Sequence, residues 1–471
     1  MTQTQNVAAL LDASARRAPD RVALIEGGRR LLYGQLERRA GGFARSLEAQ
    51  GVSAGDRVAL VLPNGIGFAV ALYGALKLGV TVAPLNPQLT ADERAHILSD
   101  FDARIVVQAV PADDAEYAAM ERPESAAIVL YTSGSTGRPK GAVLSHAAVA
   151  AGNASWMGPV MALVPDDRVL TVLPLSHSFG INGALLAPLL AGAAAVLLER
   201  FSPETVVETV RSQHVTVFPG VATMFQRILD TPGWTREDFS TVRVALSGAA
   251  PCPWPLAEAW RTRTGVRILR GYGMTELHRP ISYLANDPRD FADCIGRPVP
   301  GVEIRIVDDA GADLAQGSVG ELLIRTDAAM DCYLAQPEET SATLVGGWFK
   351  TGDLARVSPD GFVSIVGRKK EMILRGGYSV FPPEVEAALL AHPDVAEAAV
   401  IGIPHPELGE EIAAFVALRP GVALAPEDLV AWCKERVAGY KCPRVVTMMT
   451  GLPRGATGKV LKADLRAATQ R

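Results

Sequence analysis

The segment from Thr132 to Gly141 concentrates the residue types that bind phosphate. Its ten positions hold three glycines, four hydroxyl residues and two cations, directly after the apolar run 127–131. Glycine lets a backbone approach a ligand closely, amides and hydroxyls donate to phosphate oxygens, and Lys140 can neutralise charge. The pattern predicts a polyphosphate-binding loop; the alternative is a flexible surface loop.

This loop does not have the spacing of an ordinary nucleotide-binding P-loop. Pro139 stands where the second glycine of that motif is needed, and no Gly-Lys-Ser/Thr follows. A P-loop NTPase is therefore disfavoured.

A second cluster, Gly-Tyr-Gly-Met-Thr-Glu at 271–276, follows the strand-like run 266–269. Thr275 can reach a phosphate, and Glu276 can ligate Mg²⁺, which prefers oxygen donors together with substrate phosphates. Two further turns carry single reactive side chains: Asp353 ends the stretch 346–353, and Lys459 ends the stretch 455–459. Asp353 is a candidate ribose ligand, although each turn is a weak signal alone.

The elements that must position these residues alternate between strand and helix. Residues 58–62 and 80–84 read as strands on either side of a helix at 68–78, which Gly79 stops, and a similar alternation runs from 169 to 270. Such alternation predicts parallel sheets covered by helices on both faces. We interpret the apolar run 183–198 as a buried helix followed by a strand, because it is too short to span a bilayer.

The pattern changes after Cys294. Short alternating or apolar runs between Gly, Asp and Pro turns indicate a smaller β-rich unit; they lie at 302–307, 320–325 and 361–366. A compact charged break follows at 367–371, and a new α/β alternation begins after it. We place a domain boundary at Lys370.

Composition excludes several classes of function. The chain has 471 residues, 48% of them hydrophobic, and a formal net charge of -5. It can bury more than one core, and it lacks the basic field expected of a nucleic-acid-binding protein. Its five cysteines are scattered without close Cys-x-x-Cys spacing, which disfavours a zinc site or disulfide framework. Because the N-terminus does not resemble a secretory signal, we expect a cytoplasmic protein without a membrane span.

Five motifs occur together in order and in approximate spacing. They are YTSGSTGRPKG, GYGMTE, WFKTGD, GRKKEMI and PRGATGK. The chain thereby resembles, over nearly its whole length, the adenylate-forming superfamily of acyl-CoA synthetases, non-ribosomal adenylation domains and beetle luciferase.

The resemblance implies an α/β fold in two parts. A large N-terminal domain, residues 1–369, would consist of two α/β subdomains and a β-barrel-like subdomain. A small mobile α+β domain, residues 371–471, would follow the hinge residue Lys370.

The resemblance also implies an ATP site, with coenzyme A as a further substrate. The loop would bind the β- and γ-phosphates through Thr132, Ser133, Gly134, Ser135, Thr136, Gly137 and Lys140. Thr275 would hold the α-phosphate and Glu276 the Mg²⁺. The adenine side would be formed by Ala249, Ala250 and Pro251, with Tyr272 and Gly273 against the base, and Asp353 and Arg368 would bind the ribose.

Lys459 matches the family's catalytic lysine for attack of a carboxylate on the α-phosphate. That attack joins two anions, so a cation is needed at the developing charge. In the second half-reaction the small domain would rotate about Lys370 and open a thiol tunnel. Gly376, Gly377 and Tyr378 resemble the strand lining that tunnel, and Lys441 lies in a stretch common near the thiol-bearing cofactor.

The acid itself is less clearly indicated. The segment 173–180 corresponds to the family's aromatic motif, with Ser176 in place of the usual aromatic residue, and would put His177 beside the acyl group. Trp156, Phe218, Val221, Met224 and Met274 are candidate pocket walls, and ordinary core packing is the alternative. Their apolar character favours a hydrophobic or aromatic acid over a small dicarboxylate. No aspartate lies between 173 and 183 to pair with an amine, which disfavours an amino acid.

Several alternatives stay open. A carrier-protein thiol could replace CoA as the acceptor, and His177 could be a packed core residue. Arg279 could pair with a substrate or face water. A luciferase-like oxygenase shares the same motifs, whereas a non-catalytic ATP-binding regulator would be expected to lack Lys459 or Glu276.

Overall fold

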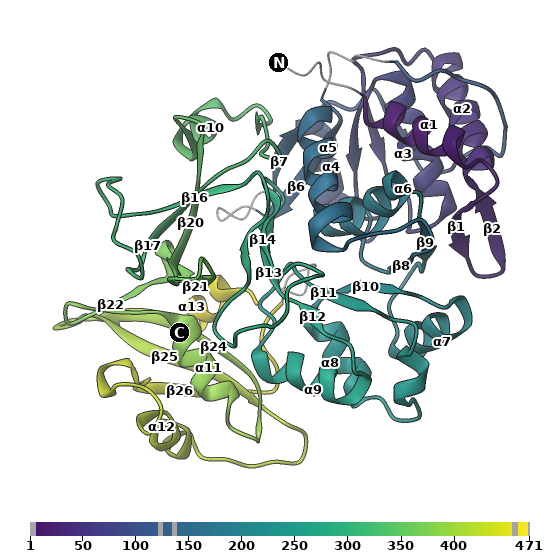
Figure 1. Ribbon diagram of the computed structural model, residues 1–471. Coiled ribbons are helices and arrows are strands. Elements are labelled where there is room, and N and C mark those ends of the chain that lie inside the picture. The colour runs from purple at the N-terminus through teal and green to yellow at the C-terminus, as the bar shows by residue number, and fades with distance from the viewer. Residues whose placement is uncertain (1–5, 121–125, 134–138, 455–459, 470–471) are drawn as a thin grey trace. The chain divides into compact units, whose positions relative to one another are not determined.

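The computed structural model describes residues 6–120, 126–133, 139–454 and 460–469 (Figure 1). Contacts divide the chain into two compact units. The first consists of Met1–Ile304 and Ile324–Phe349, and the second of Arg305–Leu323 and Lys350–Arg471. No helix in these described ranges is long and apolar enough to cross a membrane.

The first unit contains a six-stranded sheet with the order β18-β7-β6-β4-β3-β5. Its strands are β3 (Arg57–Leu60), β4 (Thr81–Pro84), β5 (Ile105–Val107), β6 (Ile128–Ser133), β7 (Pro139–Leu144) and β18 (Cys332–Tyr333). Strands β3 to β6 pair in parallel, whereas β7 runs antiparallel to both β6 and β18. The sheet is therefore mixed, and its antiparallel edge carries the predicted phosphate loop.

The helix between β3 and β4 follows directly from the sequence. In α3 (Ile66–Leu78) nearly every residue is buried, and Gly79 ends the helix in a left-handed conformation with φ of 78°. A glycine adopts this conformation without the steric cost that a Cβ would bring. The predicted strand-helix-strand order is confirmed here.

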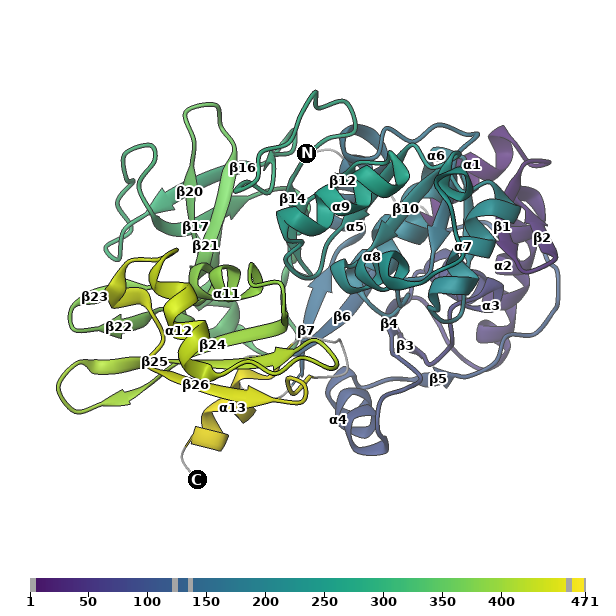
Figure 2. The same ribbon diagram turned by 90° about the horizontal axis from the view of Figure 1, so that it is seen from below.

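The second sheet of this unit has seven strands in the order β12-β11-β10-β8-β9-β1-β2. They are β1 (Val22–Glu26), β2 (Arg29–Leu32), β8 (Arg168–Thr171), β9 (Ala194–Leu197), β10 (Val217–Gly220), β11 (Val244–Ser247) and β12 (Ile268–Leu269). Helices α7 (Pro203–Gln213), α8 (Ala222–Asp230) and α9 (Trp254–Thr264) lie on one side of β10–β12 (Figures 1 and 2). A core of aromatic and aliphatic side chains fills the space between them, with Phe218, Phe225 and Trp260 in contact.

Further elements of the first unit border these sheets. The helices are α1 (Val7–Arg17), α2 (Tyr33–Ala49), α4 (Ala91–Phe101), α5 (His146–Ser155), α6 (Ala187–Ala191) and α10 (Pro337–Thr343). A three-stranded sheet comprises β13 (Gly271–Met274), β14 (His278–Ser282) and β15 (Arg297–Pro298), and β19 (Leu344–Val345) pairs with the start of β20 (Trp348–Val357). The run 183–198 is buried and forms the end of a π-helix, then α6 and β9, as predicted.

The second unit holds most of β16 (Glu303–Val307), β17 (Gly320–Arg325) and β20, together with β21 (Val363–Arg368). These strands match the β-rich region that the sequence predicts. In the described part of the chain they form an open sheet and do not close into a barrel.

A second sheet in this unit has the order β23-β22-β25-β24, with β26 paired to β25. The strands are β22 (Ile373–Arg375), β23 (Tyr378–Val380), β24 (Val395–His405), β25 (Gly409–Leu418) and β26 (Val445–Met449). Helices α11 (Pro382–Leu390) and α12 (Pro426–Lys434) lie on one face of this sheet and α13 (Lys462–Thr469) on the other (Figure 2). Alternate residues of β24 and β25 belong to the core on one face or to the core on the other. Helices therefore cover both faces, as the period-two pattern of a buried strand requires.

A buried charge cluster ties α1, α2 and α3 together. Lys77 is 0% exposed, and its Nζ lies 2.7 Å from Asp12 Oδ1 and 2.5 Å from Glu37 Oε1. The hydroxyl of Tyr73 also donates to Asp12. The Lys77 ammonium and the Asp12 carboxylate are thus buried, whereas the Glu37 side chain is 25% exposed, and removing Lys77 leaves Asp12 buried without its cation.

We predict that Lys77→Met lowers the free energy of unfolding by about 3–5 kcal/mol, because Asp12 then stays buried without its cation. Urea denaturation followed by circular dichroism measures this. The matched control is Arg29→Met, which removes the exposed pair with Glu26 and should cost less than about 1 kcal/mol. Equal losses in the two variants would contradict the prediction.

Candidate active site

The predicted phosphate loop connects two antiparallel strands. Thr132 of β6 lies opposite Lys140 of β7, and Ser133 lies opposite Pro139. The apolar start of β6 anchors this hairpin in the sheet, with Ile128, Val129 and Leu130 all buried. Gly134, Ser135, Thr136 and Gly137 lie outside the described residues. The hairpin brings the two ends of the loop, Thr132 and Lys140, side by side.

Lys140 lies in a polar and aromatic setting. Its Nζ is 2.6 Å from Glu339 Oε1, and it sits 5.6 Å from the centroid of the Tyr333 ring. The Lys140 side chain is 13% exposed and that of Glu339 is 46% exposed. Because an ion pair with so exposed a partner is weak, a phosphate could displace Glu339.

Tyr333 connects Lys140 with Glu276. Its hydroxyl donates to Glu276 Oε1 over 2.9 Å, and burial together with this carboxylate raises its pKa. Glu276 is 9% exposed and Thr275 is 8% exposed. In the described part of the chain no cation pairs with Glu276. A buried carboxylate without a cation of its own is suited to binding one.

Sequence reasoning missed Tyr333. A single tyrosine in the run 331–334 carries no local signal for a phosphate site. Its position follows from β18, which pairs with β7 so that Tyr333 lies opposite Ala142. Only this long-range pairing brings the tyrosine beside the loop.

Two further predicted segments start at neighbouring strand ends. Strand β11 ends at Ser247 and β12 at Leu269, and these strands are parallel neighbours. Ala249, Ala250 and Pro251 follow β11 and are exposed, and Ala249 has a φ of 64°. Tyr272, Gly273 and Met274 follow β12 on β13, where Tyr272 and Met274 are half-buried. Ligands of open α/β sheets bind at such carboxyl ends.

The two predicted ribose ligands are paired in the second unit. Asp353 of β20 lies opposite Arg368 of β21, and Arg368 Nε is 3.1 Å from Asp353 Oδ1. The Asp353 side chain is 4% exposed, whereas that of Arg368 is 50% exposed. The arginine therefore holds the carboxylate in place and keeps part of its guanidinium open to solvent.

The predicted residues on the CoA side also come together in the second unit. Gly376 and Gly377 have φ of 55° and 83° in the turn between β22 and β23. The next residue, Tyr378, stacks on Tyr440 with ring centroids 4.5 Å apart. Lys441 Nζ lies 2.6 Å from Glu384 Oε1 and 5.7 Å from the Tyr440 ring. Lys370 is exposed in a short 3₁₀ turn, and Lys459 lies outside the described residues.

The residues predicted to border the acyl group differ in their surroundings. His177 is half-buried, its Nδ1 accepts from the Phe179 amide over 3.3 Å, and burial lowers its pKa, so the ring is neutral near pH 7. Phe179 stacks on Trp156 with centroids 5.2 Å apart. Val221 is half-buried at the start of α8. Phe218 is fully buried against Phe225 and Trp260, which are the contacts of a core residue.

Comparisons with known proteins agree with the motifs. The family model for AMP-binding enzymes matches residues 11–122 and 108–334, and the model for the C-terminal domain of AMP-binding enzymes matches 384–459. A feruloyl-CoA synthase from Amycolatopsis sp. is 36% identical, with 96% of each chain covered.

Solved structures of similar fold cover almost the whole chain. An ATP-bound MatB from Rhodopseudomonas palustris superposes with a TM-score of 0.93 at 29% identity, covering 99% of each chain. A benzoate CoA ligase from Burkholderia xenovorans LB400 gives 0.89 at 31% identity, covering 98% of this chain and 99% of that one. The α/β fold and the resemblance to adenylate-forming acyl-CoA synthetases are confirmed: the chain belongs to the AMP-binding enzyme family.

Proposed function

We propose that the protein is an AMP-forming acyl-CoA ligase acting on a hydrophobic or aromatic carboxylic acid. A carboxylate oxygen of the acid attacks the α-phosphorus of ATP, the bond to pyrophosphate breaks, and an acyl-adenylate forms. The sulfur of CoA then attacks the acyl carbon, AMP leaves, and the thiol proton passes to solvent. The observation that carries this proposal is the position of the Tyr333 side chain. It lies beside Lys140 and donates a hydrogen bond to Glu276, and all three residues belong to the first unit.

The first step must bring two anions together. Lys140 would bind the β- and γ-phosphates in exchange for its contact with exposed Glu339, and Thr275 would hold the α-phosphate. The Glu276 carboxylate, which has no cation partner among the described residues, would hold Mg²⁺, and the ion would supply positive charge near the phosphates. Lys459 would place its ammonium at the developing charge.

The nucleoside would bind at the ends of β11 and β12. Ala249, Ala250 and Pro251 would border the adenine, with Tyr272 and Gly273 against its face. Asp353 would accept hydrogen bonds from the ribose hydroxyls, held in place by Arg368 at 3.1 Å. His177 would border the acyl group as a neutral imidazole.

The second step would follow a rotation of residues 371–471 about Lys370. It would exchange Lys459 for the aromatic and glycine surface formed by Gly376, Gly377, Tyr378 and Tyr440. Lys441 on the same surface would attract the phosphates of CoA. The cysteines are thiols rather than disulfides, which is the state expected in a reducing cytoplasm, where we place the reaction.

A direct assay tests the whole proposal. We expect a panel of aromatic and aliphatic acids, incubated with ATP, Mg²⁺ and CoA, to yield acyl-CoA thioesters that mass spectrometry identifies. Without CoA, hydroxylamine should trap the acyl-adenylate instead. The alternative acceptor is a carrier-protein thiol; thioester on a phosphopantetheinylated carrier, with none on CoA, would establish it and exclude the ligase proposal.

We predict that Lys459→Ala abolishes acid-dependent pyrophosphate exchange, because the ammonium at the developing charge is lost. Thioester formation from a preformed acyl-adenylate and CoA should continue. Lys434→Ala, an exposed lysine at the end of α12, is the control and should behave as wild type. Normal exchange in the Lys459 variant would remove this residue from the adenylation step.

We predict that Tyr333→Phe raises the Mg²⁺ concentration for half-maximal pyrophosphate exchange about tenfold, the size of one hydrogen bond to a charged group. The phenyl ring stays beside Lys140, so only the hydrogen bond to Glu276 is lost. Tyr131→Phe is the matched control, because the Tyr131 hydroxyl donates to Asp100 at 2.7 Å. An unchanged Mg²⁺ dependence in the Tyr333 variant would show that the hydrogen bond from Tyr333 to Glu276 does not contribute to Mg²⁺ binding.

A further inference from the structure

Arg279 is a buried cation without a carboxylate partner among the residues that the structure describes. It is 5% exposed on β14, and its guanidinium makes three hydrogen bonds to neutral oxygens. Nε donates to Ser282 Oγ at 2.9 Å, Nη1 to the Ser247 carbonyl at 3.0 Å and Nη2 to the Leu269 carbonyl at 2.9 Å. Of the guanidinium's five N–H groups, two therefore have no acceptor in the described part of the chain.

Two other arginines of low exposure have acidic neighbours. Arg375 pairs with Glu411 at 2.6 Å. Arg270, which also donates to two backbone carbonyls, interacts with Asp290. Burial lowers the pKa of Arg279 to about 9, so the side chain is still charged at neutral pH. An uncompensated buried charge is costly, and an anionic ligand would remove that cost.

The guanidinium lies between segments assigned to the adenylate. A Cβ on Gly271 would stand 2.5 Å from Arg279 Cζ, and a Cβ on Gly248 would stand 3.2 Å from Nη1. Because both residues are glycines without a Cβ, the guanidinium can occupy this space. Gly248 precedes the predicted adenine segment, and Gly271 begins the strand leading to Thr275. The charge therefore borders the place where an acyl-adenylate would lie.

Apolar side chains border the same group. Arg279 Cζ lies 5.3 Å from the ring of Trp156, which in turn stacks on Phe179. Phe179 is two residues from His177, which would border the acyl group. An acid bound at Arg279 would therefore have these aromatic rings close to its apolar part.

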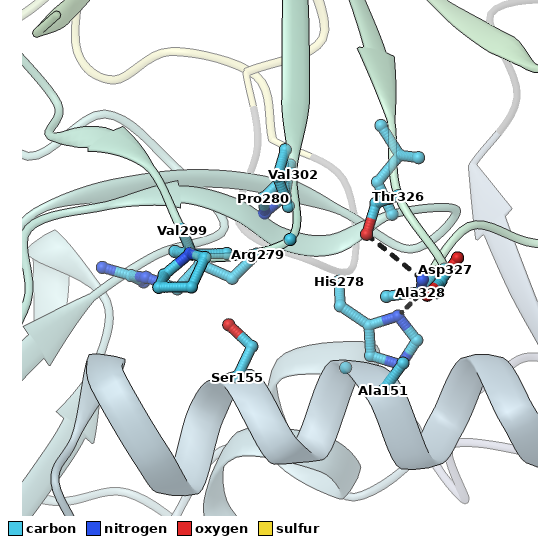
Figure 3. Close-up of a pocket in the computed structure, with 14 residues that line it drawn as sticks. Ala151, Ser155, His278, Arg279, Pro280, Val299, Val302, Thr326, Asp327 and Ala328 are labelled. Atoms are coloured by element: carbon cyan, nitrogen blue, oxygen red, sulfur yellow. Dashed lines mark hydrogen bonds between the residues drawn. The ribbon is translucent and has the colours of Figure 1, made fainter.

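A small cavity lies beside Arg279 (Figure 3). It has a volume of about 100 Å³ and is lined by α5, by β14 and by residues 299–302 and 326–328. Figure 3 shows Ser155 directed from α5 into this space, with Arg279 and His278 on opposite sides. Ser155 Oγ and His278 Nε2 are both buried without a hydrogen-bond partner in the described residues. Because a water occupies about 30 Å³ of liquid, there is room for a carboxylate.

We propose that Arg279 is a specificity-determining residue that binds a second carboxylate, carried at the far end of the activated acid. The substrate class is then a dicarboxylic acid with an aromatic or alicyclic body. Its apolar part contacts Trp156 and Phe179, and its second carboxylate takes the two N–H groups of Arg279 that have no acceptor. This inference rests on the proposed ligase function and names its substrate.

The test compares matched acids. Phenylpropanoate and phenylbutanoate are each paired with the same acid carrying a ring carboxylate, and kcat/KM is measured by pyrophosphate release. We expect wild type to prefer the diacids at least about tenfold. Arg279→Gln should lower kcat/KM about 100-fold for diacids and about threefold or less for monoacids, because only the diacid loses its charged partner. Arg279→Lys, which keeps the charge, should retain part of the preference.

Arg270→Gln is the matched control, since it removes another buried arginine that donates to carbonyls. It should leave the ratio of diacid to monoacid unchanged. A wild type without preference for diacids, or an Arg279→Gln variant in which both acids lose equally, overturns the proposal. If Arg279→Gln does not fold, the wild-type preference and Arg279→Lys still decide it.

Calorimetric binding of the same acids without ATP separates this inference from the ligase proposal. Diacid binding that depends on Arg279, with no thioester from any acid, would sink the ligase function alone. Thioesters from monoacids with no preference for diacids would sink this inference alone.

Discussion

Two buried charges of opposite sign lie three residues apart on one hairpin, and neither has a charged partner in the described chain. Glu276 accepts a hydrogen bond from Tyr333, and Arg279 donates only to neutral oxygens. Leaving such charges unpaired is unfavourable in a folded protein. The cost is tolerable where a ligand brings the missing charge, and here one residue suits a cation and the other an anion. In the function proposed above, the substrates and Mg²⁺ supply the missing charges.

The surrounding elements hold this hairpin in place. Strands β11 and β12 lie side by side, and their carboxyl ends accept the hydrogen bonds of Arg279. Beyond Glu276, the backbone amide of Met330 donates to the Glu276 carbonyl at 2.7 Å, just before β18. The same β18 carries Tyr333 beside the phosphate hairpin. The rigid sheets therefore fix the spacing between Lys140, Glu276 and Arg279.

In the second unit, neighbouring strands likewise hold charged side chains in fixed positions. Asp353 and Arg368 are cross-strand partners, so the buried carboxylate keeps its orientation. On the other side of Lys370, the stacked rings of Tyr378 and Tyr440 form a surface beside Lys441. Tyr378 is 57% exposed, so much of its ring faces solvent.

The sequence by itself determined the family and the candidate ligand-binding residues, because residue types and local spacing are enough to recognise them. The glycine and hydroxyl loop before Lys140, the carboxylate of Glu276 and the helix stop at Gly79 are all local features. The strand-helix alternation likewise follows from short-range periodicity, and most predicted elements agree with the structure. The family followed from five such motifs in order.

Only the tertiary structure decided which side chains lie beside the predicted ligand-binding residues. Tyr333 reaches Glu276 because β18 pairs with β7, and no local pattern encodes that pairing. Arg279 reads in sequence as equally suited to water or substrate, and its burial depends on Gly248 and Gly271 making room. Phe218 reads as a pocket wall, but its neighbours Phe225 and Trp260 place it in the core. The burial of a side chain and the pairing of strands depend on contacts between segments far apart in the chain, so only the complete fold determines them.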